Sequence, residues 1–297
     1  MKFATVKVKG KSQVVLVEKN NSNVLLLQAA AIKMGEAIPT TLLQCIEKAE
    51  IFLQKAKEIE QWASTQKNKS EFYVDEYVWE APIPRPAKNI FCVGKNYAEH
   101  AVEMGSEADI PEHIILFSKA PTAVIGHEAD IPRHEGITDE LDYEGELAVV
   151  IGKKGKEIRR EEALDYVFGY TIVNDITARD LQVNHKQYLL GKSLDGSCPI
   201  GPVIVEKSAI ENPNQLDIET RVNGEIRQQS NTEQFIFPVE EIIEILSKGM
   251  TLEPGDIIAT GTPAGVGKGF KPPKFLRKGD EIAIKVKGIG TLINTVH

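Results

Sequence analysis

The chain has 297 residues, 42% of them hydrophobic and 26% charged, which is the composition of a globular protein that can bury a core without disulfide or metal staples. A formal net charge of −8 and a pI near 5.4 argue against nucleic acid or an anionic membrane as the main partner, although a local basic pocket for a small anion is compatible with them. Cys45, Cys92 and Cys198 are an odd, scattered set, which indicates free thiols in a reducing compartment. The sequence has no apolar run of membrane-spanning length and no secretion-type start, so it predicts a cytoplasmic protein that does not bind membranes.

Residues 1–80 predict a small N-terminal α+β domain. Short strands are expected at 3–8, 14–18 and 24–27, with turn residues between them that include the run 20–23. A long helix is expected to open at residue 41, since Thr41 and Gln44 have capping-box spacing. Apolar residues then follow at three- and four-residue steps: Leu42, Ile46, Ala49, Leu53, Ala56, Ile59 and Trp62. The prolines of segment 81–86 predict a linker to a main domain over residues 88–297.

The main domain opens with an expected buried strand at 90–94, followed by a segment that carries His100 and Glu103. The two side chains are one turn apart if this piece is helical, and a carboxylate there can orient the imidazole and raise its basicity. That pairing is what a general base needs. A plain ion pair on a helix surface has the same spacing, and both interpretations are open at this point.

Segment 141–151 predicts a strand on which Glu144 and Glu146 point to the same face. Two like charges held so close either share a proton or hold a cation between them, and oxygen ligands favour a hard ion such as Mg²⁺, Mn²⁺ or Ca²⁺. An exposed strand edge with solvated charges is the alternative. A second expected buried strand ends at Asp175, which can complete a three-carboxylate site.

Polar and cationic side chains follow Asp175. Arg179 and Gln182 share one helical face if the chain turns helical there, and an arginine beside a carboxylate-bound metal suits a substrate carboxylate. The alternative for Arg179 is a plain salt bridge to Asp175 or Asp180. Lys192 lies in an expected loop broken by glycine and proline, and it is either a group that stabilises developing negative charge or a solvated loop lysine.

The loop 260–267 resembles a phosphate loop only superficially. Thr262 stands where a Walker A motif needs a glycine, and Gly269 stands where it needs serine or threonine. We interpret the loop as a shelf of backbone and hydroxyl groups for a small ligand. The sequence contains neither a G-x-S-x-G elbow nor an H-E-x-x-H helix, so serine-hydrolase and zincin chemistry have no support.

Five motifs occur in an order that resembles the fumarylacetoacetate hydrolase superfamily, and they are most similar to its acylpyruvase and oxaloacetate decarboxylase branch. They span 93–97 with His100, 142–146, 174–180, 191–193 and 260–267. The resemblance covers residues 88–297 and implies an α+β fold built on a mixed β-sheet roll, with a homodimer as the expected assembly. Members with an extra N-terminal domain like residues 1–80 exist, and the role of this domain stays open.

The resemblance also implies three groups of site residues. The first would hold a Mg²⁺ or Mn²⁺ ion: Glu144, Glu146 and Asp175. The second would form a base dyad on a mobile lid: His100 and Glu103. The third falls where the family contacts substrate: Arg179, Gln182, Lys192 and Thr262.

A 2-oxo acid that chelates such an ion through its C1 carboxylate and C2 carbonyl could be cleaved beyond C3, with Lys192 and Arg179 stabilising the enolate. We favour decarboxylation of oxaloacetate to pyruvate and CO₂, because the branch resemblance points there. Alternatives are hydrolysis of an acylpyruvate by water that His100 activates, or decarboxylation or isomerisation of a longer 2-oxo dicarboxylate in aromatic catabolism. A contrasting hypothesis is a non-catalytic regulatory protein that works through its N-terminal domain.

Overall fold

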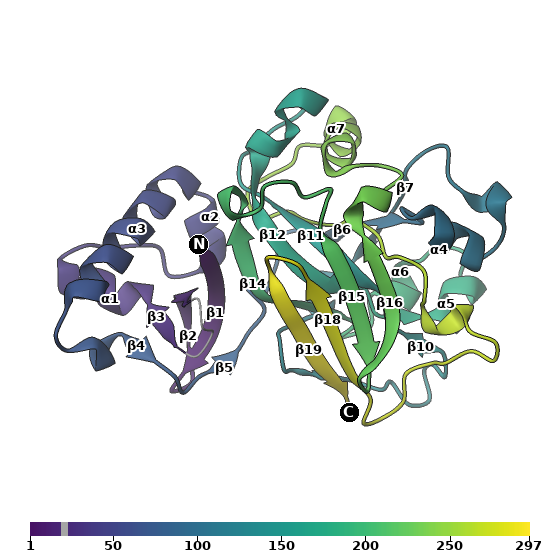
Figure 1. Cartoon of the computed structure of the whole chain (residues 1–297), viewed down its shortest axis with the longest axis horizontal. Helices are drawn as coiled ribbons and strands as arrows, with labels where there is room; N and C mark the ends of the chain where they lie inside the picture. Colours follow the sequence, from purple (N-terminus) through teal and green to yellow (C-terminus); the bar gives the residue numbers. More distant parts are fainter. Residues whose placement is uncertain (19–22) are drawn as a thin grey trace.

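The computed structural model describes residues 1–18 and 23–297, and the turn expected over 20–23 falls mostly outside them. One large sheet runs through the molecule in the order β4-β3-β2-β1-β14-β12-β11-β17-β6-β7. Its N-terminal part and the larger remainder lie side by side in Figure 1, with β1 next to β14. Most strand pairs are antiparallel, but β17 and β6 pair in parallel, so the sheet is mixed.

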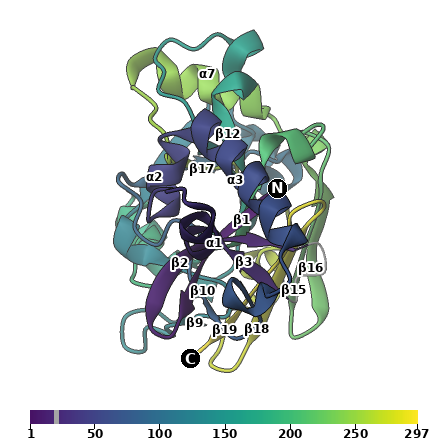
Figure 2. The same cartoon turned by 90° about the vertical axis from the view of Figure 1, so that its left-hand side faces the viewer.

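The N-terminal part combines a strand meander with helices on its outer side. Its elements are β1 (Lys2–Val8), β2 (Lys11–Val17), β3 (Val24–Leu26), α1 (Leu27–Met34), α2 (Leu42–Ile46), α3 (Ala49–Thr65), β4 (Tyr73–Val74) and β5 (Val78–Trp79). Figure 2 turns this part toward the viewer and shows α1, α2 and α3 in front of the strands. The three expected strands are present, whereas α1 was not expected.

The single long helix expected from residue 41 is wrong, because the segment forms α2 and α3 with a break at residues 47–48. Thr41 caps α2 as expected, and its hydroxyl accepts a hydrogen bond from the Gln44 amide at 3.2 Å. In α3, Ala56 and Ile59 are buried as expected, whereas Phe52 is buried in place of Leu53, which is only partly buried. Burial of the Phe52 ring removes more apolar surface from water than burial of Leu53 would.

The N-terminal strands continue the main sheet without a gap. Lys2 and Phe3 of β1 pair with Val205 and Ile204 of β14. The Phe3 ring also packs across the boundary between the two parts, and its centroid lies 6.0 Å from that of the Phe168 ring. The division into domains at residues 80–88 stays a prediction, but hydrogen bonds and apolar packing cross it.

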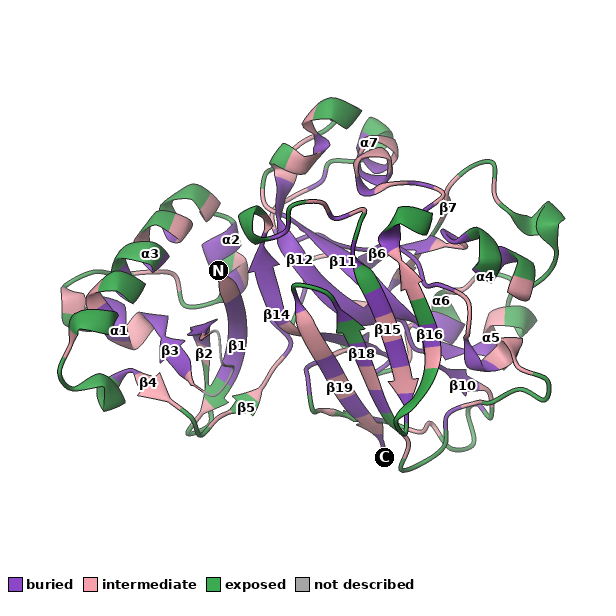
Figure 3. Cartoon of the chain, in the orientation of Figure 1, coloured by how far each residue is buried: buried purple, intermediate pink, exposed green. Residues whose placement is uncertain are grey.

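The larger part adds a second sheet over one face of the first. Its elements are β6 (Ile90–Gly94), α4 (Ala98–Glu103), β7 (Ile115–Lys119), β8 (Val124–Ile125), β9 (Asp130–Ile131), β10 (Leu141–Asp142), β11 (Gly145–Ile151), β12 (Val167–Asn174), β13 (Thr177–Ala178), α5 (Arg179–Asn184), α6 (Leu189–Lys192), β14 (Cys198–Glu206), β15 (Asp217–Val222), β16 (Glu225–Asn231), α7 (Val239–Gly249), β17 (Ile257–Ala259), β18 (Glu281–Val286) and β19 (Gly290–Val296). The second sheet has the order β16-β15-β18-β19-β9. Figure 3 shows β11, β12 and β14 buried along most of their length, as strands at the centre of a core must be.

Two local features bring the site residues together. The strands β11 and β12 pair antiparallel, with Gly145 opposite Asn174, so the acids that flank these positions meet at one end of the pair. A two-stranded ribbon of β10 and β13 leads directly into α5 and α6, which form a helical hairpin.

Among residues 1–18 and 23–297, none of the helices combines the length and apolar composition of a membrane span.

Candidate active site

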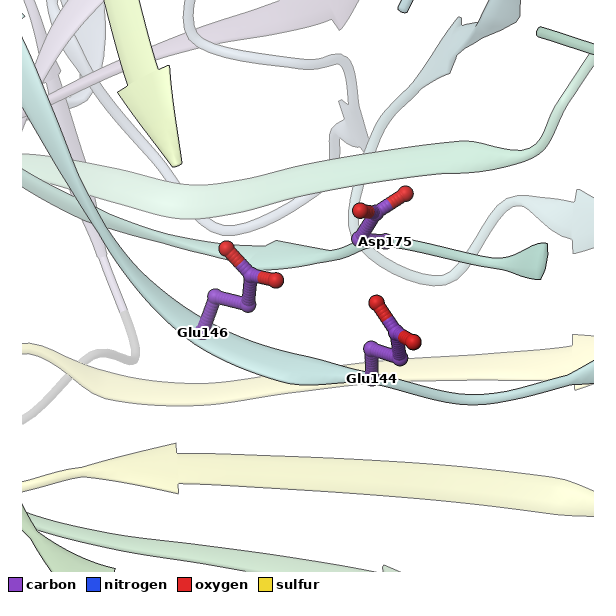
Figure 4. Close-up of side chains that lie close together, drawn as sticks. All are labelled: Glu144, Glu146 and Asp175. Atoms are coloured by element: carbon purple, nitrogen blue, oxygen red, sulfur yellow. The ribbon is translucent and has the colours of Figure 1, made fainter. Parts of the chain in front are cut away.

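Glu144, Glu146 and Asp175 converge at the end of the β11–β12 pair. All three are buried, and one oxygen from each carboxylate lies within 4.8 Å of the others. Figure 4 shows the three side chains close to one another, Glu144 and Glu146 on one ribbon and Asp175 on its neighbour. Three buried carboxylates at this spacing repel one another strongly unless protons or cations lie between them.

The backbone fixes this arrangement. The Asp175 amide donates to the Glu144 carbonyl at 2.8 Å, and the Glu144 amide donates to the Asn174 side-chain oxygen at 3.1 Å. Gly145 separates the two glutamates, and a Cβ at that position would collide with the Thr220 hydroxyl. Glycine therefore allows β15 to approach closely behind the carboxylates.

Two cations predicted as site residues contact these acids. The Lys192 ammonium lies between Glu144 and Asp175, 2.7 Å from one carboxylate and 2.8 Å from the other. Arg179 places Nη1 2.7 Å from Glu144 and Nε 2.8 Å from Asp142. Lys192 was expected in a loop, but it ends the short helix α6, where packing against α5 buries it.

Two further charged residues of the cluster, Lys119 and Asp142, were not predicted as site residues. Lys119 is fully buried on β7, and its ammonium lies 2.8 Å from Asp175 and donates to the Ile176 carbonyl at 2.9 Å. Nothing in the sequence around Lys119 indicates that Asp175 is its partner. Asp142 stood within a recognised motif, and its acceptance of the Arg179 guanidinium is evident only in the fold.

The pKa values of the two glutamates are driven apart. Burial by itself raises the pKa of Glu144, but the charges of Lys192 and Arg179 outweigh it and bring the pKa to about 2. Burial and the neighbouring charges of Asp175 and Glu144 raise the pKa of Glu146 well above its ordinary value, and the hydrogen bond from the Gly261 amide, at 2.8 Å, offsets this only in part.

The charge balance of the cluster fits a divalent cation. Four acids face three cations within the described cluster, which leaves one excess negative charge when all are ionised: Asp142, Glu144, Glu146 and Asp175 against Lys119, Arg179 and Lys192. Oxygen-only donors with an excess of negative charge are the ligands that Mg²⁺ and Mn²⁺ prefer. The residues present therefore fit the ion that the sequence motifs imply.

His100 and Glu103 form the pair that their spacing predicted. Both lie on α4, and His100 Nδ1 is 3.2 Å from one oxygen of Glu103. The other Glu103 oxygen accepts a hydrogen bond from the Gly265 amide at 2.9 Å. Since Nδ1 faces the carboxylate, Nε2 is the nitrogen left for a substrate. The motion of this segment as a lid stays a prediction.

A cleft with a volume of about 440 Å³ joins these groups. Seven of the predicted residues line it: His100, Glu144, Glu146, Arg179, Gln182, Lys192 and Thr262. The rest of its lining is Val93, Gly94, Lys95, Met104, Phe117, Val183, Lys186 and Tyr188.

The Arg179 side chain keeps one nitrogen, with its two N–H donors, for a ligand. Its Nη1 also donates to Gln182 at 3.3 Å, but its Nη2 is buried and has no partner among the described residues. On the opposite side, the Thr262 hydroxyl donates to the Gly145 carbonyl at 3.0 Å and accepts from Gln228 at 2.7 Å. A buried donor without a partner costs free energy, so it marks a place where an acceptor of a ligand would fit.

The family model described as fumarylacetoacetate (FAA) hydrolase C-terminal matches residues 89–297, and the chain belongs to this family. It is 54% identical over 301 aligned positions to oxaloacetate tautomerase YisK of Bacillus subtilis (strain 168), and the alignment covers 100% of both chains. The resemblance inferred from the five motifs is thereby confirmed.

Solved structures extend this likeness to the whole fold. A fumarylacetoacetate hydrolase from Exiguobacterium antarcticum is 40% identical, with a TM-score of 0.82 over 100% of this chain and 99% of that one. Maleylpyruvate hydrolase from Sphingobium sp. SYK-6, solved in complex with manganese (II) ion and pyruvate, is 27% identical, with a TM-score of 0.79 over 100% and 98% of the two chains. The α+β class with a mixed sheet at its centre is confirmed.

Proposed function

We propose that this protein is a Mg²⁺- or Mn²⁺-dependent enzyme that interconverts the enol and keto forms of oxaloacetate. The observation that carries the proposal is one cleft lined by His100, Glu144, Glu146 and Arg179, with Glu103 bonded to the imidazole and Asp175 beside the two glutamates behind this lining. The full-length identity of 54% to a protein named for this reaction supports the choice of substrate. A bound 2-oxo acid in the manganese-containing maleylpyruvate hydrolase supports the choice of ligand class.

The metal donors would be Glu144, Glu146 and Asp175. When bound there, the ion would supply Lewis acidity that draws electrons from the C2 carbonyl of a 2-oxo acid and acidifies its C3 protons. The buried carboxylates hold their positions through the backbone, so they would bind the ion without rearrangement of β11 and β12.

His100 is the group that would move the proton. Its Nε2 removes a proton from C3, the electron pair forms the C2–C3 double bond, and the C2 oxygen takes the negative charge. Protonation of that oxygen from solvent completes the enol, and ketonisation is the reverse. Glu103 orients the imidazole through Nδ1, at 3.2 Å, and leaves Nε2 for the substrate.

Lys192 and Arg179 would stabilise the negative charge that develops on the substrate. Burial alone lowers the pKa of Lys192, but Asp175 and Glu144 outweigh burial and raise it, so Lys192 stays charged at neutral pH. Arg179 lines the same cleft, and its unpartnered Nη2 would donate to an oxygen of the substrate. Gln182 and Thr262 would orient the ligand by further hydrogen bonds from the cleft wall.

Decarboxylation of oxaloacetate is the second candidate, and the sequence motifs favour it. It passes through the same enolate, but it breaks the C3–C4 bond and releases CO₂, so it needs no base at C3. The well-built His100–Glu103 dyad therefore favours proton transfer. Hydrolysis of an acylpyruvate, or the isomerisation or decarboxylation of a longer 2-oxo dicarboxylate, uses the same electron sink and stays an alternative.

The test separates these reactions by product. Enol oxaloacetate is added to chelator-treated protein with and without Mn²⁺; loss of the enol is followed by ultraviolet absorbance, and pyruvate is followed by a coupled lactate dehydrogenase. We expect the parent to consume the enol in a metal-dependent reaction without releasing a matching amount of pyruvate. The Glu146→Gln variant should not accelerate the loss of the enol. Pyruvate release at the same rate as loss of the enol would establish the decarboxylase instead. If the protein accelerated neither process, both proposed reactions would be refuted.

We also propose that the protein is a homodimer in the cytoplasm, as the family resemblance and the composition suggest. Light scattering coupled to size-exclusion chromatography measures the assembly directly. A monomeric mass would overturn this part of the proposal without affecting the chemistry.

A further inference from the structure

Asp142 connects the substrate arginine to a distant loop. This aspartate ends β10 and is fully buried. It accepts from Arg179 Nε at 2.8 Å and from two amides of the loop after β17, Gly267 at 2.7 Å and Lys268 at 3.1 Å. Hydrogen bonds to an ionised carboxylate in a buried site are strong and directional, so this one side chain fixes both the guanidinium and the loop.

The same loop also holds the base dyad. We call residues 265–269 the clamp loop. At its start, the Gly265 amide donates to Glu103 at 2.9 Å, while the Gly265 carbonyl accepts from the Tyr143 hydroxyl at 2.7 Å. At its end, Gly269 lies so close to Glu103 that a Cβ there would collide with the carboxylate. The clamp loop thus touches the partner of His100 at both of its ends.

The clamp loop fits Asp142 without spare room. A Cβ on Gly267 would lie 2.6 Å from the Asp142 carboxylate and would also collide with the Lys274 carbonyl. A shift of the carboxylate therefore moves the loop, and a shift of the loop moves the carboxylate.

The guanidinium is held on two of its three nitrogens. Asp142 takes Nε and Glu144 takes Nη1, at 2.8 and 2.7 Å. Because the group is planar, these two contacts determine where Nη2 points, and Nη2 is the atom without a partner among the described residues. Glu144 belongs to the metal donor set, so Asp142 is the contact devoted to orientation alone.

We propose that Asp142 is a positioning residue that aims the free arm of Arg179 at the substrate and, through the clamp loop, holds Glu103 against His100. The substrate anchor and the base are then set together by one buried carboxylate that itself touches neither substrate nor metal. The inference rests on the proposed function for the reaction, but its contacts stand on the geometry alone.

The first test is Asp142→Asn, which keeps the shape and one acceptor oxygen but removes the charge. We expect KM for oxaloacetate to rise roughly 10- to 100-fold, with a smaller fall in kcat and a Mn²⁺ affinity within about threefold of the parent. Asp139→Asn makes the same chemical change at a side chain that is 99% exposed and serves as the matched control. An unchanged KM in a folded Asp142→Asn protein would overturn the proposal.

A second variant guards against simple loss of folding. Gly267→Ala changes no charged group but pushes on the Asp142 carboxylate, so it should raise KM in the same way. Circular dichroism and the Mn²⁺-induced shift in melting temperature report folding and the metal donors separately. If both variants keep the parental KM, Asp142 is merely structural.

The third test asks whether the clamp loop couples the two groups. Asp142 and Glu103 share the loop and are not bonded to each other, so independent roles would make the losses in kcat/KM of Asp142→Asn and Glu103→Gln multiply. We expect the double variant to lose at least about threefold less than that product. Multiplying losses would refute the coupling.

Binding of pyruvate to the Mn²⁺-loaded protein separates failure of this inference from failure of the proposed function. Pyruvate keeps the carboxylate and carbonyl of the substrate but requires no turnover. Its effect on the melting temperature should weaken in Asp142→Asn and persist in Asp139→Asn, whether or not oxaloacetate is the physiological substrate. Equal pyruvate binding in both variants would count against Asp142 as a positioning residue.

Discussion

The N-terminal part and the active-site region belong to one continuous sheet, but they bury different chemistry. Among the described residues of 1–80, Thr5 is the one buried polar side chain, and the rest of the interior there is apolar. The active-site region buries seven charged side chains: Lys119, Asp142, Glu144, Glu146, Asp175, Arg179 and Lys192. The two regions therefore share one sheet, but the interior of the first is almost entirely apolar and that of the second is charged.

This difference separates stability from function. Apolar burial stabilises a fold by about 25 cal/mol for each Å² removed from water. Buried charges cost free energy even when paired, and well-packed apolar residues in their place are often as stable or more so. The N-terminal interior is thus explained by packing, whereas the charged cluster is explained by the ligands that it is arranged to hold.

The largest effect is expected from removal of a metal donor. Glu146→Ala should lower kcat/KM for oxaloacetate by at least about 1,000-fold, because the Lewis acid is lost with its site. The variant should remain folded without metal, because it leaves three acids and three cations in the buried cluster, whose charges balance. Exposed Glu135→Ala is the control. Calorimetric Mn²⁺ titration should show weakened binding, and full activity with parental Mn²⁺ affinity would contradict the assignment.

The opposite result is expected in the N-terminal part. Phe52→Ala should cost about 3–5 kcal/mol in the free energy of unfolding, because it leaves a cavity between α3 and β1 where the ring lies 4.9 Å from that of Phe3. The kcat/KM of the folded protein should stay within about twofold of the parent. Ile51→Ala, at a residue that is 62% exposed, should change stability by less than about 0.5 kcal/mol. Denaturant unfolding measures the free energy of unfolding of both variants. Equal losses in Phe52→Ala and Ile51→Ala would contradict the role of apolar packing in the N-terminal part.

Lys192 should separate catalysis from metal binding. Lys192→Met removes a cation that contacts two metal donors, so Mn²⁺ should bind at least as tightly, while kcat should fall about 100-fold for want of charge stabilisation. Isothermal titration and steady-state kinetics give the two quantities. A loss of Mn²⁺ affinity that parallels the loss of kcat would show that Lys192 supports the donors themselves.

The smallest effect is a pH dependence of the metal-free protein. The pKa of Glu146 is raised in the folded state above its ordinary 4.5, so its contribution to stability is present below pH 4.5 and is lost as pH rises through the raised value. This loss is at most about 1.4 kcal/mol per pH unit for one proton. Melting temperatures with and without Mn²⁺ should diverge as pH rises, since the ion replaces the proton. The divergence should shrink in Glu146→Gln, and a constant difference in the parent would contradict the pKa shift.

Local pattern accounts for what could be predicted of the site. Glu144 and Glu146 share a face because of the two-residue period of a strand, and His100 and Glu103 meet because of the helical turn. The same local reasoning failed for the helix after Thr41, which breaks at residues 47–48 and buries Phe52 in place of Leu53. Lys192 was placed in a loop because glycine and proline surround it, although packing on α5 makes it helical.

The sequence by itself determined the family, the α+β class and the identity of the acids, because these depend on motifs and on spacing over a few residues. Only the tertiary structure decided how the charges are balanced. Lys119 meets Asp175 across 56 positions of the chain, and Asp142 meets Gly267 across 125. Contacts at such separations depend on how β7, β10 and the loop after β17 come together, which no local pattern encodes. The one unpartnered nitrogen of the Arg179 guanidinium follows from that convergence, because Asp142 and Glu144 bind Nε and Nη1.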